Sequence, residues 1–343
     1  MKKVRLGKTG LMVTKTSFGA LPIQRVDRAT AKSILQNAYH AGINYFDTAR
    51  AYTDSEEKIG EALAQFRHSI VISTKTAAKT KDQMVKELDT SLKNMKTDYI
   101  DIYQMHNAPA LPDPEDPNSV YAGMLEAKRQ GKIRHIGITA HRYDVAWEAA
   151  ASGLFDTVQF PLSYLSDQRD LDLLNRCEQY DVGFIAMKAL SGGLCSSAKA
   201  VFAFMQQHPY AVPIYGIQRQ SELDEFLALD ANPPVFDEEM KALIERERVE
   251  FAGEFCRSCG YCMPCPAGIE IPTVARLHLL VTRSPYQRYI TKEYYESLKV
   301  VDQCLHCGAC SSRCPYQMDV PSMVRKQYDK YLKFYEEHKG EVE

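Results

Sequence analysis

The sequence lacks an excess of charge of either sign and lacks long apolar runs. Its 42 lysine and arginine residues face 44 aspartate and glutamate residues, which gives a formal net charge of -2. Nucleic-acid-binding domains usually carry a clear basic excess, so such a partner is excluded. No apolar run approaches the roughly 18 residues that a membrane span needs, and no signal-peptide core follows the first residues. We therefore expect a cytoplasmic protein without nucleic-acid or membrane partners.

A glycine-rich dinucleotide motif of the form G-x-G-x-x-G is also absent after the first predicted strand, which weakens a doubly wound fold. Strand and helix patterns alternate instead. The predicted strands are Thr16–Gly19, Tyr45–Asp47, Ile70–Lys75, Ile100–His106, His135–Thr139, Thr157–Phe160, Gly183–Met187 and Val212–Gly216. Helical periodicity fills the gaps between them, notably over 29–41, 55–66, 81–95, 121–130, 167–180 and 221–229. Because parallel strands need crossover helices, eight alternations predict an α/β fold, a (β/α)8 TIM barrel.

Further segments flank the predicted barrel. Residues 4–13 have the pattern of an N-terminal β-hairpin that could plug one barrel end. We expect the barrel to span 1–235, a charged linker helix to span 236–250, and a small cysteine-rich domain to span 251–343.

Four residues with chemically active side chains stand at or just past the ends of early strands. Asp47 ends the second strand, Tyr52 follows in the next loop, Lys75 ends the third strand, and His106 ends the fourth. In a parallel barrel these ends share one rim, where active sites lie. Each residue alone could be structural, as a turn cap, a packed aromatic, an ion pair or a core histidine.

Together with their flanking sequences, GINYFDTARAYTDSEEKIGEAL and DIYQMHN, these residues resemble the aldo-keto reductase family over roughly residues 1–235. The resemblance implies that Tyr52 is the general acid that protonates a carbonyl oxygen. A phenol of pKa about 10 is a poor acid at neutral pH unless its anion is stabilised. Lys75 would lower this pKa, Asp47 would keep the lysine charged, and His106 would orient the substrate oxygen.

The same resemblance implies a nicotinamide dinucleotide, NADPH or NADH, bound across this rim. Thr139 and Gln159 match positions that contact the carboxamide. Ala140 stands where the family usually has Asn, and Met187 replaces an aromatic residue that commonly stacks on the nicotinamide ring. Lys188 could reach a phosphate.

The segment PIYGIQRQSELDEF, which contains Gly216 and Arg219, resembles the part of the family that grips the adenosine phosphate. Tyr215 replaces a usual Pro, Phe226 a usual Asn, and Glu222 falls where many members carry Arg. A carboxylate there would repel a 2'-phosphate, although Arg219 could compensate. These departures argue against strict NADPH dependence and leave NADH or FMN open.

Eight of the ten cysteines crowd into the C-terminal region in two runs that each end in Cys-Pro. They are Cys256, Cys259, Cys262, Cys265, Cys304, Cys307, Cys310 and Cys314. The second run fits C-x2-C-x2-C-x3-C-P, and the first is one residue shorter before its last cysteine. Zinc would need only paired C-x2-C sites, so this pattern favours two 4Fe-4S clusters.

In two-cluster ferredoxins the fourth cysteine of each run binds the other cluster. By that logic Cys314 joins the first three cysteines of the first run, and Cys265 joins the first three of the second. Helical periodicity between the runs, over 271–283 and 291–299, resembles α-helical ferredoxin domains.

We therefore expect an oxidoreductase that interconverts a carbonyl and an alcohol in the barrel, with clusters that relay electrons to or from a ferredoxin or flavodoxin-like carrier. Two alternatives stay open. The cleft could hold FMN, because a flavin can take a hydride and release single electrons. Alternatively, a nicotinamide-dependent carbonyl reductase could carry clusters that are only structural or redox-sensing.

Overall fold

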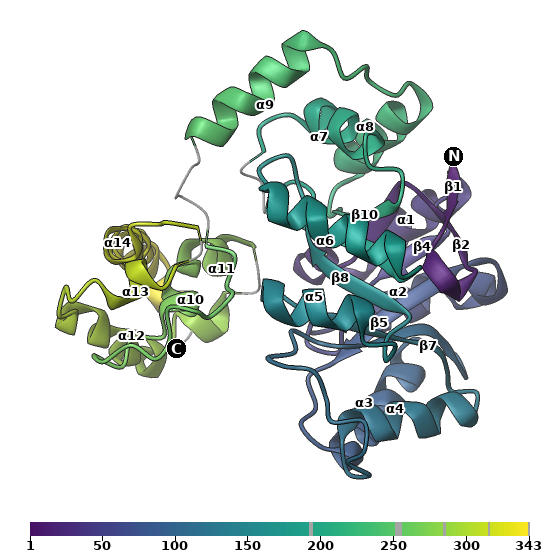
Figure 1. Ribbon diagram of the computed structural model, residues 1–343, viewed down its shortest axis with the longest axis horizontal. Helices are drawn as coiled ribbons and strands as arrows, with labels where there is room; N and C mark the ends of the chain where they lie inside the picture. Colours follow the sequence, from purple (N-terminus) through teal and green to yellow (C-terminus); the bar gives the residue numbers. More distant parts are fainter. Residues whose placement is uncertain (192–194, 251–255, 284–285, 315, 342–343) are drawn as a thin grey trace. The chain divides into compact units, whose positions relative to one another are not determined.

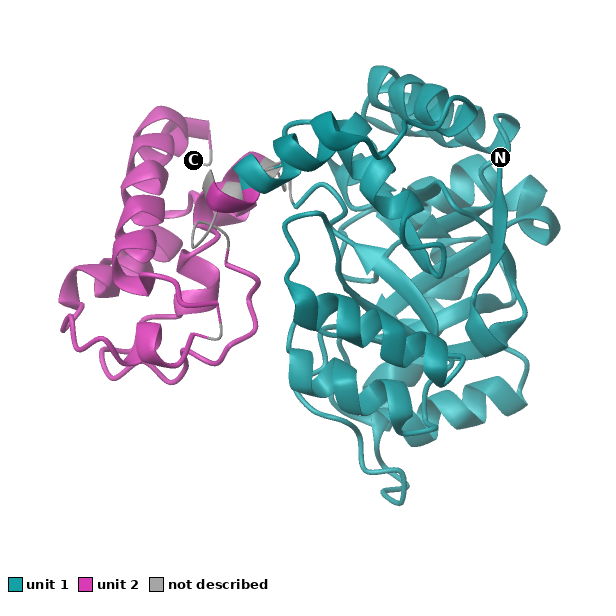
Figure 2. Cartoon of the chain, turned by 45° about the horizontal axis from the view of Figure 1, so that its top comes forward, with its two compact units in different colours: residues 1–247 teal, residues 248–343 magenta. Residues whose placement is uncertain are grey.

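The computed structural model describes residues 1–191, 195–250, 256–283, 286–314 and 316–341. The chain divides into two compact units, 1–247 and 248–343 (Figure 2). The predicted start of the cysteine-rich domain at residue 251 lies outside the described residues. In the described parts of the chain, no helix is long and apolar enough to span a membrane.

The first unit is a closed barrel of parallel strands surrounded by helices, which confirms the predicted fold class (Figure 1). The strand order around the barrel is β10-β3-β4-β5-β6-β7-β8-β9. The strands are β3 Ser17–Gly19, β4 Tyr45–Asp47, β5 Val71–Thr76, β6 Ile100–Met105, β7 Ile133–Thr139, β8 Thr157–Pro161, β9 Gly183–Met187 and β10 Ala211–Gly216. The crossover helices are α1 Arg28–His40, α2 Ser55–Leu63, α3 Lys81–Asn94, α4 Val120–Arg129, α5 Tyr143–Ala151, α6 Gln168–Gln179, α7 Ala198–Gln206 and α8 Gln220–Ala231.

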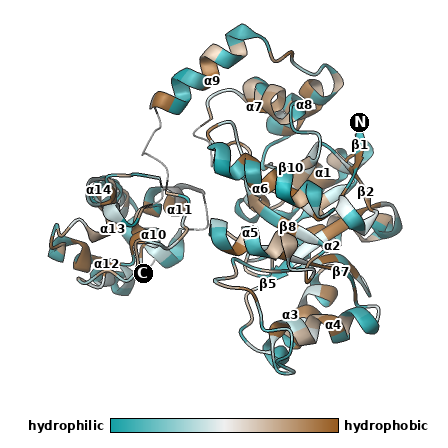
Figure 3. Ribbon diagram, in the orientation of Figure 1, coloured by the Kyte–Doolittle hydropathy of each residue, from teal (hydrophilic) through white to brown (hydrophobic). Residues whose placement is uncertain are grey.

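The barrel helices pack apolar residues against the strands, and most of their exposed positions are polar (Figure 3). In α1, for example, the buried residues are Ala31, Ile34, Leu35 and Ala38, which recur at the helical spacing. The Asp27 side chain accepts a hydrogen bond from the Thr30 amide and so defines where this helix begins.

The barrel interior changes from apolar to polar along the strands. Because side chains alternate between the two faces of a strand, Val71, Ser73 and Lys75 of β5 share one face. Val71 belongs to an apolar cluster with Leu6 and Val13, two residues from the N-terminal hairpin. That hairpin pairs β1 Lys3–Arg5 with β2 Met12–Thr14, as predicted. Polar interior side chains therefore collect toward the carboxyl ends of the strands.

The predicted linker helix is α9 Glu238–Glu250, and its first turns belong to the barrel unit. Met240 and Ile244 are buried in the main apolar cluster of the barrel. Glu247 is 4% exposed and accepts hydrogen bonds from the hydroxyls of Tyr164 and Ser196. This part of α9 is thus packed against the barrel and is not a free linker.

The second unit is helical. Its helices are α10 Ile271–Val274, α11 Leu277–Arg283, α12 Lys292–Leu298, α13 Ala309–Ser312 and α14 Val320–His338. Strands are absent from the described residues of this unit, in line with the sequence. Helix α14, which the sequence analysis did not predict, buries Val320, Val324 and Tyr328 in the apolar core of the unit.

Candidate functional site

Asp47 and Lys75 form a buried ion pair at the polar end of the barrel interior. Lys75 Nζ lies 2.6 Å from Asp47 Oδ2 and also donates to the Thr48 carbonyl oxygen at 2.6 Å. The side chains of Lys75 and Asp47 are only 1% and 2% exposed. Burial lowers the pKa of Lys75, whereas the adjacent Asp47 carboxylate raises it and favours the charged form.

Three further side chains, Ser73, Gln104 and Gln159, surround the Asp47 carboxylate, and the first two were not predicted from the sequence. The Ser73 hydroxyl donates to Asp47 Oδ1 at 2.6 Å, and Gln104 Nε2 lies 3.4 Å from the same oxygen. Gln104 Nε2 also donates to Gln159 Oε1 at 2.8 Å. Ser73 and Gln104 stand at inward positions of β5 and β6, so strand alternation could have identified them. This network fixes the direction of the carboxylate toward Lys75.

Tyr52 and His106 lie beside this pair. Their ring centroids are 5.8 Å apart at an interplanar angle of 80°, and Lys75 Nζ lies 5.4 Å from the Tyr52 ring centroid. Burial, and secondarily the Lys75 charge, lower the pKa of His106 to about 3. His106 is therefore neutral at neutral pH and can act as a hydrogen-bond donor from one ring nitrogen.

The pKa of Tyr52 differs from the sequence-based expectation. Burial raises it above the usual value of a phenol, and the Asp47 carboxylate adds to the effect. The net direction is opposite to the lowering that was predicted from Lys75, whose Nζ donates hydrogen bonds to Asp47 and to the Thr48 carbonyl oxygen. The phenol consequently stays protonated at neutral pH.

The predicted nicotinamide contacts lie on neighbouring strands of the same rim. Thr139 of β7 pairs in register with Gln159 of β8, and both side chains are buried. The Thr139 hydroxyl accepts a hydrogen bond from the Asn107 amide at 2.7 Å. Met187 ends β9, and Lys188 follows it with a φ of 57°. The structure therefore places the Gln159 amide 3.5 Å from Asp47 Oδ2, with Thr139 on the neighbouring strand.

The predicted adenosine-phosphate segment, residues 213–226, runs from the second half of β10 into the first half of α8. Glu222 accepts hydrogen bonds from the backbone amides of Gln218 at 2.9 Å and Arg219 at 3.2 Å. Arg219 has a side chain that is 70% exposed, and its Nε lies 3.9 Å from Glu222 Oε1. Backbone amides at the start of a helix can bind a phosphate. Here the Glu222 carboxylate already accepts hydrogen bonds from two such amides.

The unusual residues Tyr215 and Phe226 have a packing role. The Tyr215 ring stacks on Phe202 with centroids 4.7 Å apart and lies 5.1 Å from the ring of Phe226. All three side chains are buried in the apolar cluster between the barrel and its helices. Tyr215 and Phe226 lie in the segment that was predicted to grip the adenosine phosphate, whereas Phe202 lies outside it.

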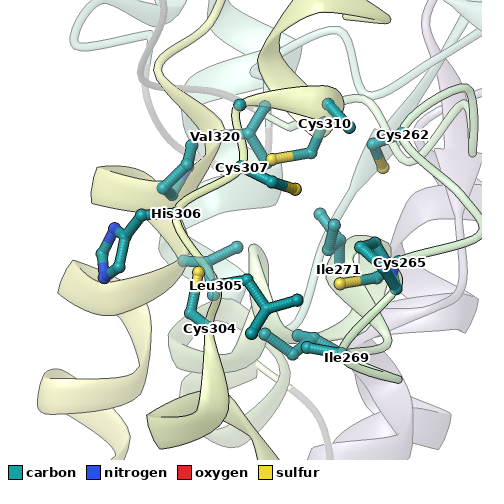
Figure 4. A pocket seen from close by; sticks show the side chains of 16 residues that line it. Cys262, Cys265, Ile269, Ile271, Cys304, Leu305, His306, Cys307, Cys310 and Val320 are labelled. Atoms are coloured by element: carbon teal, nitrogen blue, oxygen red, sulfur yellow. The ribbon is translucent and has the colours of Figure 1, made fainter.

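In the second unit the cysteines gather around two cavities. One cavity is lined by Cys256, Cys259, Cys262 and Cys314. The other is lined by Cys265, Cys304, Cys307 and Cys310, and also by Cys262 (Figure 4). Each cavity thus contains three cysteines of one run and the last cysteine of the other, with Ile271 and Val320 lining both.

The two cysteine loops repeat one backbone conformation. Ser258 and Gly260 of the first run have φ angles of 60° and 83°, and the equivalent His306 and Gly308 have 49° and 71°. Left-handed residues in such loops can turn successive amides toward one side and form a concavity that suits an anionic group. Thiol ligands, apolar walls and this backbone geometry fit iron–sulfur clusters.

Comparison with known proteins gives two matches within the chain. Residues 14–209 match the aldo/keto reductase family, and residues 255–319 match the 4Fe-4S dicluster domain. The second match decides between zinc and iron–sulfur chemistry in favour of a 4Fe-4S dicluster domain.

Similar proteins agree with the first match. An uncharacterized oxidoreductase of Bacillus subtilis, YqkF, is 29% identical over 57% of this chain and 66% of its own length. L-galactose dehydrogenase of Arabidopsis thaliana is 30% identical over 55% of this chain and 65% of its own length. The chain thus spans slightly less than two thirds of these curated relatives.

A solved structure, aldo-keto reductase AKR11C1 from Bacillus halodurans in its holo form, has the same fold. It superposes with a TM-score of 0.64 at 22% identity and covers 72% of this chain and 96% of its own. The family match spans more than half of the chain and includes the strands that carry Asp47 and Lys75 and the turn after β6 that carries His106. The chain therefore belongs to the aldo/keto reductase family and carries a 4Fe-4S dicluster domain in addition.

Proposed function

We propose that the barrel interconverts a carbonyl and an alcohol at Tyr52, Lys75, Asp47 and His106. The observation that carries this proposal is the buried Asp47–Lys75 pair beside the rings of Tyr52 and His106, which meet edge to face. Burying two charges costs several kcal/mol unless geometry and hydrogen bonds compensate. An ion pair of this cost, located at the carboxyl ends of barrel strands and next to the Tyr52 phenol, supports a catalytic role for these residues.

Each side chain has a defined part in the reduction. Tyr52 donates its proton to the carbonyl oxygen, and because its raised pKa makes the phenol a weak acid, this step needs a positive charge beside the developing anion. Lys75 offsets the negative charge that develops on the phenol oxygen as the proton leaves. His106, neutral because its pKa is lowered to about 3, donates a hydrogen bond that orients the carbonyl oxygen.

The residues of the rim fit a nicotinamide dinucleotide, which supplies the hydride when bound. Thr139 and Gln159 would hold the carboxamide, Met187 would lie against the ring, and Lys188 would pair with a phosphate. Gly216 and Arg219 would border the adenosine. Because Glu222 occupies amides at the start of α8, the arrangement supports NADH over NADPH.

This cofactor preference predicts the effect of Glu222→Gln. The variant keeps an acceptor for the Gln218 amide but removes the negative charge that opposes a 2'-phosphate. We expect the ratio of kcat/KM for NADPH to that for NADH to rise about tenfold, equivalent to about 1.4 kcal/mol.

Glu225→Gln is the matched control, because it makes the same change at an exposed position of α8. Its cofactor ratio should equal that of the unaltered protein. An unchanged ratio in Glu222→Gln, or a strong NADPH preference in the unaltered protein, would refute the role of Glu222.

We further propose that the second unit exchanges single electrons with a carrier protein. Cys256, Cys259, Cys262 and Cys314 would hold one 4Fe-4S cluster, and Cys265, Cys304, Cys307 and Cys310 would hold the other. Such clusters pass one electron at a time. A hydride carries two electrons, so a relay needs a group that links the two kinds of transfer, and a flavin such as FMN is one that can.

The visible spectrum of protein purified without oxygen tests the relay. We expect the cluster absorbance to bleach after NADH is added, and we expect the bleached protein to release a flavin on denaturation. If a carbonyl is reduced while the absorbance stays unchanged, the clusters are structural or redox-sensing and the barrel alone is the catalyst.

A further inference from the structure

The loop that carries Cys307 is the most exposed part of either cysteine set. Leu305, His306, Cys307 and Gly308 are all exposed, and the Leu305 side chain reaches 65%. Cys307 is the only exposed member of the eight cysteines in the two runs, all of which are described. Electron exchange between proteins requires close approach of the two redox groups, so the cavity behind this loop is favourably placed for it.

A groove begins directly beside this loop. We call it the α14 groove, and it is lined by His306, Arg325, Lys326, Asp329, Lys330 and Lys333. His306 and Pro321 line both this groove and the cavity of the second cysteine set. The groove and the cavity therefore share a wall.

The α14 groove is predominantly basic. Arg325, Lys326, Lys330 and Lys333 contribute positive charge, and Asp329 is its one acidic lining residue. Arg325 is already paired, at 2.6 Å each, with Asp302 and Asp329. Lys330 and Lys333 are exposed and form no ion pair with any residue that the structure describes. Their charges remain for a partner of opposite sign.

The positions of these lysines follow from the helix. Residues 322, 326, 330 and 333 recur at a spacing of three to four and so share one face of α14. Val320, Val324 and Tyr328 on the other side are buried in the core of the unit. Because this opposite side of α14 is buried in the core, the lysine side chains face the solvent.

We propose that the α14 groove, with the exposed loop Leu305–Gly308, is the docking surface for a small acidic one-electron carrier protein. The basic groove lies beside a loop with an exposed apolar residue, and charge complementarity would steer an acidic partner to this surface. One electron passes per encounter, so the carrier is reduced by one electron and this protein is oxidised by one. The proposal rests on the electron-exchange role given above to the second unit.

Stopped-flow mixing tests the surface without using the barrel. The protein is reduced anaerobically with dithionite, freed of excess reductant by gel filtration, and mixed with oxidised plant-type [2Fe-2S] ferredoxin as the acidic probe. We expect the second-order rate constant to fall about tenfold or more as ionic strength rises from about 20 mM to about 300 mM.

The groove variant Lys330→Glu/Lys333→Glu should lower the low-salt rate constant about tenfold and flatten its salt dependence. The control Lys32→Glu/Lys292→Glu makes the same change of net charge at exposed lysines outside the groove, and it should transfer electrons at the unaltered rate. Full cluster absorbance and an unchanged circular dichroism spectrum verify that each variant is folded and loaded.

Equal rates in the groove variant and the unaltered protein would overturn the proposal, as would equal slowing in both variants. Titration with inorganic pyrophosphate provides a further decision. If the groove lysines are needed for pyrophosphate binding and not for ferredoxin reduction, the groove is a site for a small phosphate anion.

Tyr52→Phe should donate electrons to ferredoxin normally, so failure of the docking proposal is distinguishable from failure of the barrel chemistry.

Discussion

Tyr52→Phe is expected to lower kcat for carbonyl reduction by about 10²- to 10⁴-fold, the usual contribution of a positioned general acid. The variant keeps the ring that faces His106 and removes only the proton donor. Because the phenol is protonated at neutral pH, the loss should be constant across the neutral range. The measurement is NADH oxidation with 4-nitrobenzaldehyde as a probe carbonyl, together with the cluster absorbance.

Tyr39→Phe is the matched control for this experiment. It removes a hydroxyl that lies 3.0 Å from the Ser69 hydroxyl on the exterior of the barrel unit. We expect full activity and full cluster content in the control, and full cluster content in Tyr52→Phe. Substantial turnover in Tyr52→Phe would show that the proton comes from another group, and the assignment of the general acid would be abandoned.

The strands were predictable from sequence because each is short, apolar and bounded by a helical pattern. The predicted limits of β4 and β9, Tyr45–Asp47 and Gly183–Met187, equal the observed ones. Parallel strands also imply a common rim, which brought Asp47, Lys75 and His106 together in the prediction. Local pattern and barrel topology therefore sufficed for the fold and for the location of the candidate site.

Features that depend on partners distant in sequence were not predictable in the same way. The pKa of Tyr52 depends on which groups the Lys75 ammonium contacts. This ammonium donates hydrogen bonds to Asp47 and to the Thr48 carbonyl oxygen. The packing of Tyr215 depends on Phe202. Spacing alone does not determine such pairs, because several side chains could reach each position.

Two other features had signals in the sequence that the analysis did not use. Helix α14 has buried residues at 320, 323, 324, 328 and 331, which is a clear helical period. Glu222 stands three residues after Arg219, where an acidic side chain commonly caps a helix start. The hydrogen bonds of Glu222 to backbone amides therefore give it a structural role besides the predicted repulsion of a phosphate.

Lys75→Met is expected to destabilise the barrel by about 3–5 kcal/mol, because it leaves the Asp47 carboxylate buried without its partner. Ser73 and Gln104 still donate to that carboxylate, but neither carries a positive charge. Urea unfolding followed by tryptophan fluorescence measures this loss. The chain contains one tryptophan, Trp147 of α5, so its signal reports on the barrel unit.

A double-mutant cycle with Asp47→Asn isolates the coupling between the two charges. The double variant Asp47→Asn/Lys75→Met buries no ion and should recover most of the stability that Lys75→Met loses. Double-variant destabilisation equal to the sum of the two single changes would mean that the ion pair contributes no coupling. Each charge would then be tolerated without the other, and the stabilising role given to the ion pair would be wrong.

Asp47→Asn should also change how stability depends on pH. Burial lowers the pKa of Lys75 in the folded state, and this variant lacks the carboxylate that opposes the shift. The unfolded state therefore binds the extra proton, and the loss of stability relative to the unaltered protein shrinks as pH rises. A loss of stability that stays constant as pH rises would contradict a charged Lys75 in the buried pair.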